Sequence, residues 1–202
     1  TFAMRYFINV EHFQCNKPIL FYTGNEGQLE GFAENTGFMW DIAPSLQAAV
    51  VFAEHRFYGK TQPFGNESYA SVRSLGYLTS EQALADFAML IENLKKHRIK
   101  CSQHSPVIAF GGSYGGMLAA WMRVKYPHLV QGAIAASAPV FWFPDSGVEE
   151  NIYDRIVTRT FTGSGCDYQA ILRGWKALET LAGSDRGRKY LNTLFKLEQK
   201  SL

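Results

Sequence analysis

The sequence has no long hydrophobic run, no excess of one charge and few cysteines. Its longest uncharged stretch, residues 101–122, is interrupted by serine, proline and glycine, so it lacks the roughly 20 mainly apolar residues of a membrane-spanning helix. Twenty basic residues face 18 acidic ones, a net charge of +2, which argues against a nucleic-acid-binding protein. Cys15, Cys101 and Cys166 are too few and too widely spaced to predict a disulfide framework or a metal site.

The composition is that of a folded protein with a sizeable apolar interior. Hydrophobic residues make up 47% of the 202 residues and aromatic residues 14%. Four continuous apolar runs are typical of strands that are covered on both faces of a parallel sheet. These runs are residues 19–22, 48–53, 107–110 and 132–136.

Helical patterns alternate with these runs. Thr79 and Gln82 have capping-box spacing, and apolar residues on one helical face follow them. A second helix is expected over residues 117–126, before Pro127. Strands alternating with helices predict an α/β fold for residues 1–143. Beyond Pro144 only helical spacing remains, so residues 144–202 are predicted to begin a helical subdomain.

One motif carries chemistry. Gly111-Gly112-Ser113-Tyr114-Gly115 matches G-x-S-x-G, with an apolar strand before it and a helix after it. This context is that of a nucleophile elbow, in which a strained turn lifts the serine hydroxyl above the sheet. Ser113 is therefore the predicted nucleophile, and the Tyr114 N–H is a predicted oxyanion donor. The alternative is a glycine-rich turn whose serine only caps a helix.

Three further segments are candidates for the site. Asn25 and Glu26 follow the first strand, where a second oxyanion donor is expected; the alternative is a simple strand-ending turn. Residues 54–56 (Glu54, His55 and Arg56) end the next strand and are candidates for substrate binding or for support of the oxyanion loop. A structural Glu54–Arg56 charge cluster is the slightly favoured alternative there. Asn66 begins a glycosylation sequon, which permits a secretory route.

A serine hydrolase also needs a histidine base, and in this fold the order along the chain is serine, acid, histidine. His128 is the only histidine after Ser113. The intervening helix places it roughly 15 Å from the elbow. His55 is the only earlier histidine expected near the site, and its order is wrong. The acid and the base are therefore expected beyond this chain.

Five blocks of the sequence resemble the family of lysosomal Pro-X carboxypeptidase and dipeptidyl peptidase II, which are serine exopeptidases. The blocks are residues 19–27, 51–59, 78–87, 111–129 and 135–139. Two further passages, residues 37–41 and 117–121, are more similar to Pro-X carboxypeptidase. The resemblance covers most of residues 2–145 and is weaker beyond them.

The resemblance implies a partial α/β-hydrolase fold with a helical cap inserted after the strand that ends near Val140. It implies Ser113 as nucleophile, cleavage next to proline by a carboxypeptidase or a dipeptidyl peptidase, and no cofactor. It also implies a lysosomal or secreted glycoprotein, although no signal peptide is evident at Thr1. The expected partner is a peptide with proline near one terminus, and a homodimer is one option.

The sequence also departs from the family pattern. The family's catalytic aspartate and histidine lie after the cap and have no matching position here, and Cys166 has no obvious partner for the disulfides that cap cysteines form. Two alternatives stay open: an esterase on the same scaffold, and a truncated, non-catalytic hydrolase-like protein. A truncated sheet exposes apolar surface, so poor solubility is expected of this chain alone.

Overall fold

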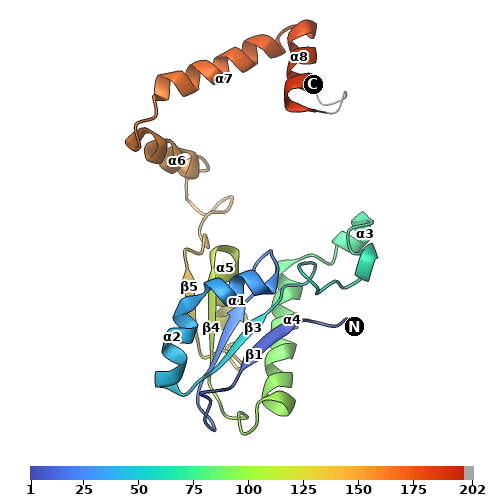
Figure 1. Ribbon diagram of the computed structural model, residues 1–202, viewed down its shortest axis with the longest axis vertical. Helices are drawn as coiled ribbons and strands as arrows, with labels where there is room; N and C mark the ends of the chain where they lie inside the picture. The colour runs from blue at the N-terminus through green and yellow to red at the C-terminus, as the bar shows by residue number, and fades with distance from the viewer. Residues whose placement is uncertain (198–202) are drawn as a thin grey trace. The chain divides into compact units, whose positions relative to one another are not determined.

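The computed structural model describes residues 1–197, which fall into two compact units: residues 1–140, and the residues from Phe141 onward. The first unit is built on a five-stranded sheet of order β1-β3-β2-β4-β5 (Figure 1). Strands β2 to β5 are parallel, and β1 pairs antiparallel with β3. The strands are β1 (Tyr6–Asn9), β2 (Ile19–Thr23), β3 (Ala49–Ala53), β4 (Val107–Gly112) and β5 (Gly132–Ala136). All four predicted strands are confirmed; the edge strand β1 was not predicted.

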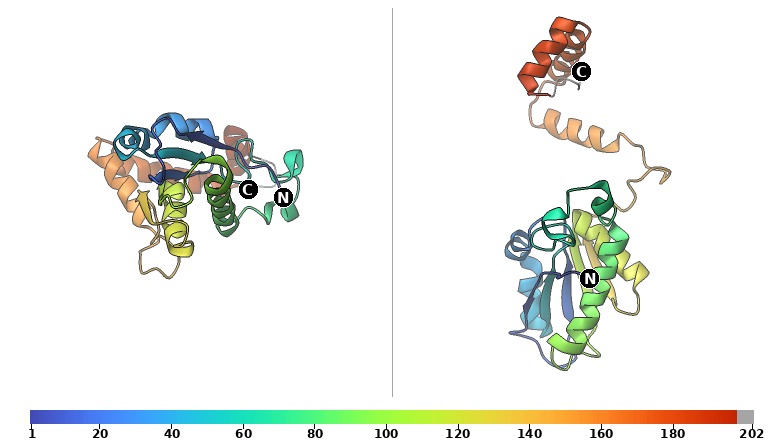
Figure 2. Two further views of the ribbon diagram at one scale, coloured as in Figure 1. Left: turned by 90° about the horizontal axis from the view of Figure 1, so that it is seen from below. Right: turned by 90° about the vertical axis from the view of Figure 1, so that its right-hand side faces the viewer.

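Helices cover both faces of this sheet (Figure 2, left). Ile19 and Phe21 of β2 belong to the core shared with α4 (Ser80–Asn93) and α5 (Ser113–Lys125). Leu20 and Tyr22, between them, belong to the opposite core, which is shared with α1 (Leu29–Asn35) and α2 (Gly37–Leu46). Because successive side chains of a strand point to opposite faces, a strand buried on both faces is apolar at every position. This explains the apolar runs of β2, β3 and β4. The expectation of cover on both faces is wrong for β5, which lies at the edge of the sheet and is partly exposed.

The predicted helices are present, with one shifted boundary. The Thr79 hydroxyl accepts from the Gln82 N–H at 3.3 Å and caps α4, as the sequence predicts. Helix α5 begins at Ser113, four residues before the predicted start at Met117. Three short elements complete the unit: the 3₁₀ turn η1 (Gly65–Glu67), α3 (Val72–Leu75) and the π-helical turn η2 (Leu94–Arg98).

The cysteines correct an expectation. Cys15 and Cys101 form a disulfide across 86 positions of sequence, whereas their spacing suggested no framework. Cys15 precedes β2 and Cys101 precedes β4; these strands are neighbours in the sheet, so the loops that lead into them meet. Distance along the chain says nothing about such a meeting. Disulfides that close long loops typically contribute about 2–4 kcal/mol. Cys166 is free and exposed.

The second unit contains helices α6 (Ile152–Gly163), α7 (Tyr168–Ala182) and α8 (Asp185–Phe195). The first two end at the predicted breaks near Gly163 and Gly183, and α7 packs on α8 with Leu191 buried. Large apolar side chains are exposed on these helices, among them Trp175 at 63% and Phe195 at 54%. The boundary after residue 143, the interpretation of this unit as the start of a cap, and the poor solubility stay predictions.

Candidate active site

Ser113 lies at the junction of β4 and α5, exposed, with a backbone φ of +55°. A serine rarely adopts this left-handed conformation, which costs of order 1–3 kcal/mol and persists only where the surroundings hold it. A strand that turns sharply into a helix through a strained, exposed serine is the geometry of a nucleophile elbow. The sequence-predicted nucleophile thus lies where such chemistry requires it.

The two outer glycines of the motif are required by contacts in the turn. A Cβ atom on Gly111 would lie 2.1 Å from the carbonyl oxygen of Gly115. A Cβ atom on Gly115 would lie 2.3 Å from Oδ1 of Asn25 and 2.8 Å from the carbonyl oxygen of Thr23. A Cβ atom on Gly112, at a variable position of the motif, would have no atom within 4 Å. The pattern G-x-S-x-G therefore reflects where strand, helix and the Asn25 loop touch.

Thr23 ties the end of β2 to both arms of the elbow. Its buried hydroxyl lies 3.1 Å from the carbonyl oxygen of Phe110 in β4 and 2.8 Å from that of Gly115 in α5. One hydroxyl hydrogen is shared between these two acceptors. The motif sequence alone did not reveal this residue, although its position at the end of a strand next to β4 is a signal for it.

Asn25 is brought to the elbow as predicted, and its side chain supports the turn. Its Nδ2 donates to the carbonyl oxygen of Gly112 at 2.7 Å, and its Oδ1 accepts from the Tyr22 hydroxyl at 2.7 Å. Asn25 is 7% exposed, whereas Glu26 beside it is exposed. The side chain of Asn25 is thus engaged in structure, and only its backbone N–H or that of Glu26 is left for the predicted oxyanion role.

Glu54 is buried, and its carboxylate joins the start of α1, which follows the Asn25 loop, to the loop at residues 60–61. Its Oε1 accepts from the N–H of Leu29, the first residue of α1, at 3.2 Å. Its Oε2 accepts from the Lys60 N–H at 3.0 Å and from the Thr61 hydroxyl at 2.7 Å. A carboxylate at a helix N-terminus is stabilised by the exposed N–H groups there. Glu54 thereby fixes the point at which the chain leaves the Asn25 loop.

The expected Glu54–Arg56 charge cluster is wrong in its partners. Glu54 instead lies 4.0 Å from a guanidinium nitrogen of Arg5. Arg56 forms a bidentate pair with Asp86 of α4, with both N–O distances at 2.7 Å, and also bonds the Gln82 side chain. Each residue does tie loops together, but they do so in two separate networks, because they point away from β3 in different directions.

His55 lies beside the nucleophile. Its Nε2 is 2.9 Å from the hydroxyl of Tyr114, the residue after Ser113, and its Nδ1 is 2.7 Å from the carbonyl oxygen of Arg56. The imidazole is 1% exposed, and burial lowers the pKa of His55 below its usual 6.5. Burial likewise raises the pKa of Tyr114 to about 12. Sequence reasoning placed His55 near the site but did not predict this contact.

The other histidines lie away from the carboxyl ends of the parallel strands, where Ser113 is. His12 follows the antiparallel strand β1, His97 follows α4, and His104 precedes β4. His128 follows α5, about 20 Å along that helix from its first residue. The absence of the base from this chain stays a prediction.

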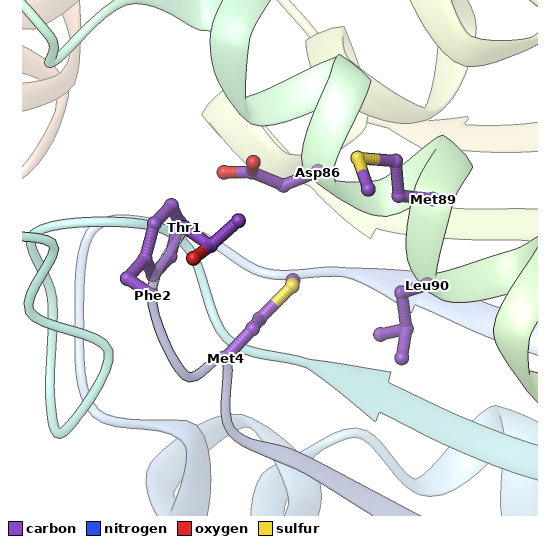
Figure 3. A pocket seen from close by; sticks show the side chains of 6 residues that line it. All are labelled: Thr1, Phe2, Met4, Asp86, Met89 and Leu90. Atoms are coloured by element: carbon purple, nitrogen blue, oxygen red, sulfur yellow. The ribbon is translucent and has the colours of Figure 1, made fainter.

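Two hollows in the first unit differ in how close they lie to the elbow. One of about 270 Å³ lies between the N-terminal segment and α4; Figure 3 shows its lining residues Thr1, Phe2, Met4, Asp86, Met89 and Leu90. It does not include the elbow. Another of about 220 Å³ borders Gly111 and Gly112, with Tyr22, Phe38 and Ile134 among its other walls. The second hollow reaches the backbone directly before Ser113 and is the better placed for substrate.

Two features are absent from residues 1–197: a cluster of metal-ligating side chains and a membrane-spanning helix. Within residues 1–197, no three histidine, cysteine, aspartate or glutamate side chains gather closely enough to hold a metal ion. Among the helices of the same residues, none is both long and apolar enough to cross a membrane.

Comparisons with known proteins agree with the geometry of the elbow. The chain is 66% identical over 200 residues to "Prolyl carboxy peptidase like protein 5" of Caenorhabditis elegans. The match covers 99% of this chain and 39% of that protein. It is 52% identical over 194 residues to the lysosomal Pro-X carboxypeptidase of Homo sapiens, covering 95% of this chain and 38% of that protein. The chain thus spans about two fifths of the length of these relatives.

Among solved structures, a proline iminopeptidase of Mycobacterium smegmatis matches 91% of this chain and 54% of its own, with a TM-score of 0.53 at 16% identity. At that identity the likeness concerns the fold alone, and it confirms the partial α/β-hydrolase fold. The family model described as serine carboxypeptidase S28 matches residues 1–201. With the strained serine, its two obligate glycines and these matches together, the chain belongs to the serine carboxypeptidase S28 family.

Proposed function

We propose that this chain carries the nucleophile of a serine exopeptidase that hydrolyses peptide bonds next to proline. The observation that carries the proposal is Ser113 at φ +55° in a turn that admits only glycine at positions 111 and 115. Membership of the S28 family and the Pro-X carboxypeptidase relatives support the substrate class. Because the chain spans only part of those relatives, the activity is proposed for the full-length protein.

In this proposal the Ser113 hydroxyl attacks the carbonyl carbon of the scissile bond and gives its proton to a histidine. The Tyr114 N–H and the N–H of Asn25 or Glu26 donate to the oxyanion of the tetrahedral intermediate. The intermediate collapses, the histidine returns the proton to the leaving amine, and an acyl-enzyme on Ser113 remains. Water activated by the same histidine then releases the acid. The histidine and its aspartate are proposed to lie outside residues 1–202.

The test is the Ser113→Ala variant of the full-length protein, assayed with a prolyl peptide. Loss of a catalytic serine removes about 10⁴-fold or more of kcat, because no nucleophile remains. Ser45→Ala is a matched control, since Ser45 is exposed on α2 and its hydroxyl bonds only locally, to the carbonyl oxygen of Ile42. Full activity in Ser113→Ala, or an equal loss in both variants, would contradict the assignment.

The choice of substrate terminus requires a second comparison. A peptide with a blocked amino terminus and a free carboxylate after Pro-X is cleaved by a carboxypeptidase only. A peptide with a free amino terminus and a blocked carboxyl terminus is cleaved by a dipeptidyl peptidase only. A short ester assayed in parallel identifies an esterase. Labelling of Ser113 by a fluorophosphonate, which reacts with activated serines, separates all three from a non-catalytic protein.

We also propose a lysosomal or secreted location, with N-glycosylation at Asn66. The Cys15–Cys101 disulfide supports this location, because disulfides persist mainly in oxidising compartments. Asn66 lies exposed in η1, where it is accessible for modification. The lysosomal name of the human relative points the same way. A homodimer stays a prediction.

A further inference from the structure

Resting on the proposed function, a further role concerns His55, which lies 58 positions before the nucleophile. We propose that His55 is a positioning residue: it holds the Tyr114 hydroxyl and thereby orients the Tyr114 N–H toward the oxyanion. His55 does not touch Ser113 or the substrate in this role. It acts through Tyr114, whose backbone N–H directly follows the proposed nucleophile Ser113.

The strained turn at Ser113 needs a restraint. Ser113 has a left-handed backbone, and such strain persists only where neighbouring groups over-determine it. The peptide unit between Ser113 and Tyr114 carries the oxyanion N–H, so rotation of that unit misdirects the donor. That peptide unit ends at the Cα atom of Tyr114, and the Tyr114 side chain extends from the same atom. The hydroxyl at the end of the ring lies 2.9 Å from Nε2 of His55. The ring is therefore held at both ends, which restricts the peptide unit.

The contacts of His55 decide which of its ring nitrogens carries the hydrogen. Nδ1 of His55 lies 2.7 Å from the carbonyl oxygen of Arg56, and a carbonyl oxygen can only accept. Nδ1 therefore carries the hydrogen, and in the neutral ring Nε2 is an acceptor. The Tyr114 hydroxyl donates to it. This direction is the one that a phenol and a neutral imidazole favour. Burial lowers the pKa of His55 and raises that of Tyr114, which favours the uncharged form of each.

The imidazole of His55 is held firmly by its neighbours. His55 is packed edge-on against the rings of Tyr58 and Phe87, with ring centroids at 5.3 and 6.4 Å. The backbone of Arg56, which accepts from Nδ1, belongs to a residue held by its bidentate pair with Asp86 of α4. A connected set of contacts thus runs from helix α4 to the first peptide of α5. A group fixed this firmly can position another, whereas a mobile one cannot.

The experiment uses four test variants and one control variant of the full-length protein. Tyr114→Phe removes the hydroxyl, His55→Leu removes the acceptor at similar volume, and the double variant removes both. His55→Gln supplies a side-chain oxygen that can accept. Tyr58→Phe is the matched control, because it removes a phenol hydroxyl from another ring packed on His55. Kcat and KM are measured with a prolyl peptide, and the rate of fluorophosphonate attachment to Ser113 is measured separately.

Loss of a whole oxyanion donor costs about 100- to 1,000-fold in kcat, so a misdirected donor is expected to cost about tenfold. Tyr114→Phe and His55→Leu should each lower kcat and the attachment rate about tenfold, with KM within about twofold. The double variant should fall no further than either single variant, because both remove one contact. His55→Gln should recover most of the loss, and Tyr58→Phe should behave as wild type.

The proposal is overturned if Tyr114→Phe leaves kcat and the attachment rate within about twofold of wild type. It is also overturned if KM rises while kcat stays, since the phenol would then bind substrate. If His55→Leu does not fold, the Tyr114→Phe rates decide. The outcome can also separate this role from the proposed substrate class. If the fluorophosphonate labels Ser113 of the wild-type protein but no prolyl peptide is cleaved, the proposed substrate class is wrong. The labelling rates of the variants then still decide the role of His55.

Discussion

Substitution of glycine by alanine in the nucleophile turn is expected to have different effects at positions 111, 112 and 115, because the space for a Cβ atom differs at each. A methyl group on Gly111 meets the carbonyl oxygen of Gly115 at 2.1 Å and its carbonyl carbon at 2.3 Å. A methyl group on Gly115 meets the Asn25 side chain at 2.3 Å and the Thr23 backbone at 2.8 Å. A methyl group on Gly112 meets nothing within 4 Å, and the φ of −117° and ψ of 147° there suit alanine.

The expected magnitudes follow from these distances. Carbon atoms pack at about 3.5–4.0 Å, so Gly111→Ala must separate strand and helix by more than about 1 Å. Overpacking of this kind costs typically about 1–3 kcal/mol, and Gly111→Ala should lie at the upper end because both clashing atoms belong to the backbone. A displacement of about 1 Å costs about 100-fold in rate. Gly115→Ala should be intermediate, since the side chain of Asn25 can move in part.

The assay combines fluorophosphonate attachment at Ser113 with denaturant unfolding of the full-length protein. Gly112→Ala is the matched control, expected within about 0.5 kcal/mol of wild type and close to it in rate. Equal behaviour of Gly111→Ala and Gly112→Ala would refute the reasoning. It would show that strand β4 and helix α5 are not in the close contact that the turn requires.

Two further predictions concern other residues. Burial lowers the pKa of His55, whereas the hydrogen bond to the Arg56 carbonyl oxygen raises it to a smaller extent; the Arg56 charge lowers this pKa further, and Asp86 and Glu26 raise it. The net pKa is lowered, so the unfolded chain binds its proton first as the pH falls. Wild-type stability relative to His55→Gln should therefore be constant above about pH 6.5 and fall below it, by at most about 1.4 kcal/mol per pH unit; a relative gain toward acid would contradict a lowered pKa. Asn66→Gln should remove one enzymatically cleavable glycan from the protein expressed in a eukaryotic secretory pathway, measured as intact mass; a mass that differs from wild type only by the added methylene group would mean that Asn66 is not glycosylated.

Strands β2, β3 and β4 were predictable because burial on both faces leaves an uninterrupted apolar run. Strand β5 has such a run as well, although it is partly exposed. The edge strand β1 (Tyr6–Asn9) was not, because it is only partly buried and carries a mixed pattern. Helices α1 and α2 were also missed. The second of them contains Pro44, a residue that argues against a helix when the sequence is read alone.

In the site, Ser113 and its two glycines were predictable because the motif is local: five consecutive residues contain the whole turn. The support for that turn is not local. Thr23 reaches across 87 and 92 positions to its acceptors, and His55 reaches across 59 positions to Tyr114. No spacing rule connects such pairs, so sequence reasoning could name their neighbourhood but not their contacts.

The sequence by itself determined the fold class, the four parallel strands with the helices α4 and α5 between them, and the proposed nucleophile. These depend on hydrophobic periodicity and on backbone requirements that neighbouring residues express together. Only the tertiary structure decided that Cys15 meets Cys101, that Glu54 and Arg56 take separate partners, and that His55 bonds Tyr114. Those contacts depend on which strands lie side by side in the sheet, and the pairing of strands brings together residues that the sequence keeps far apart.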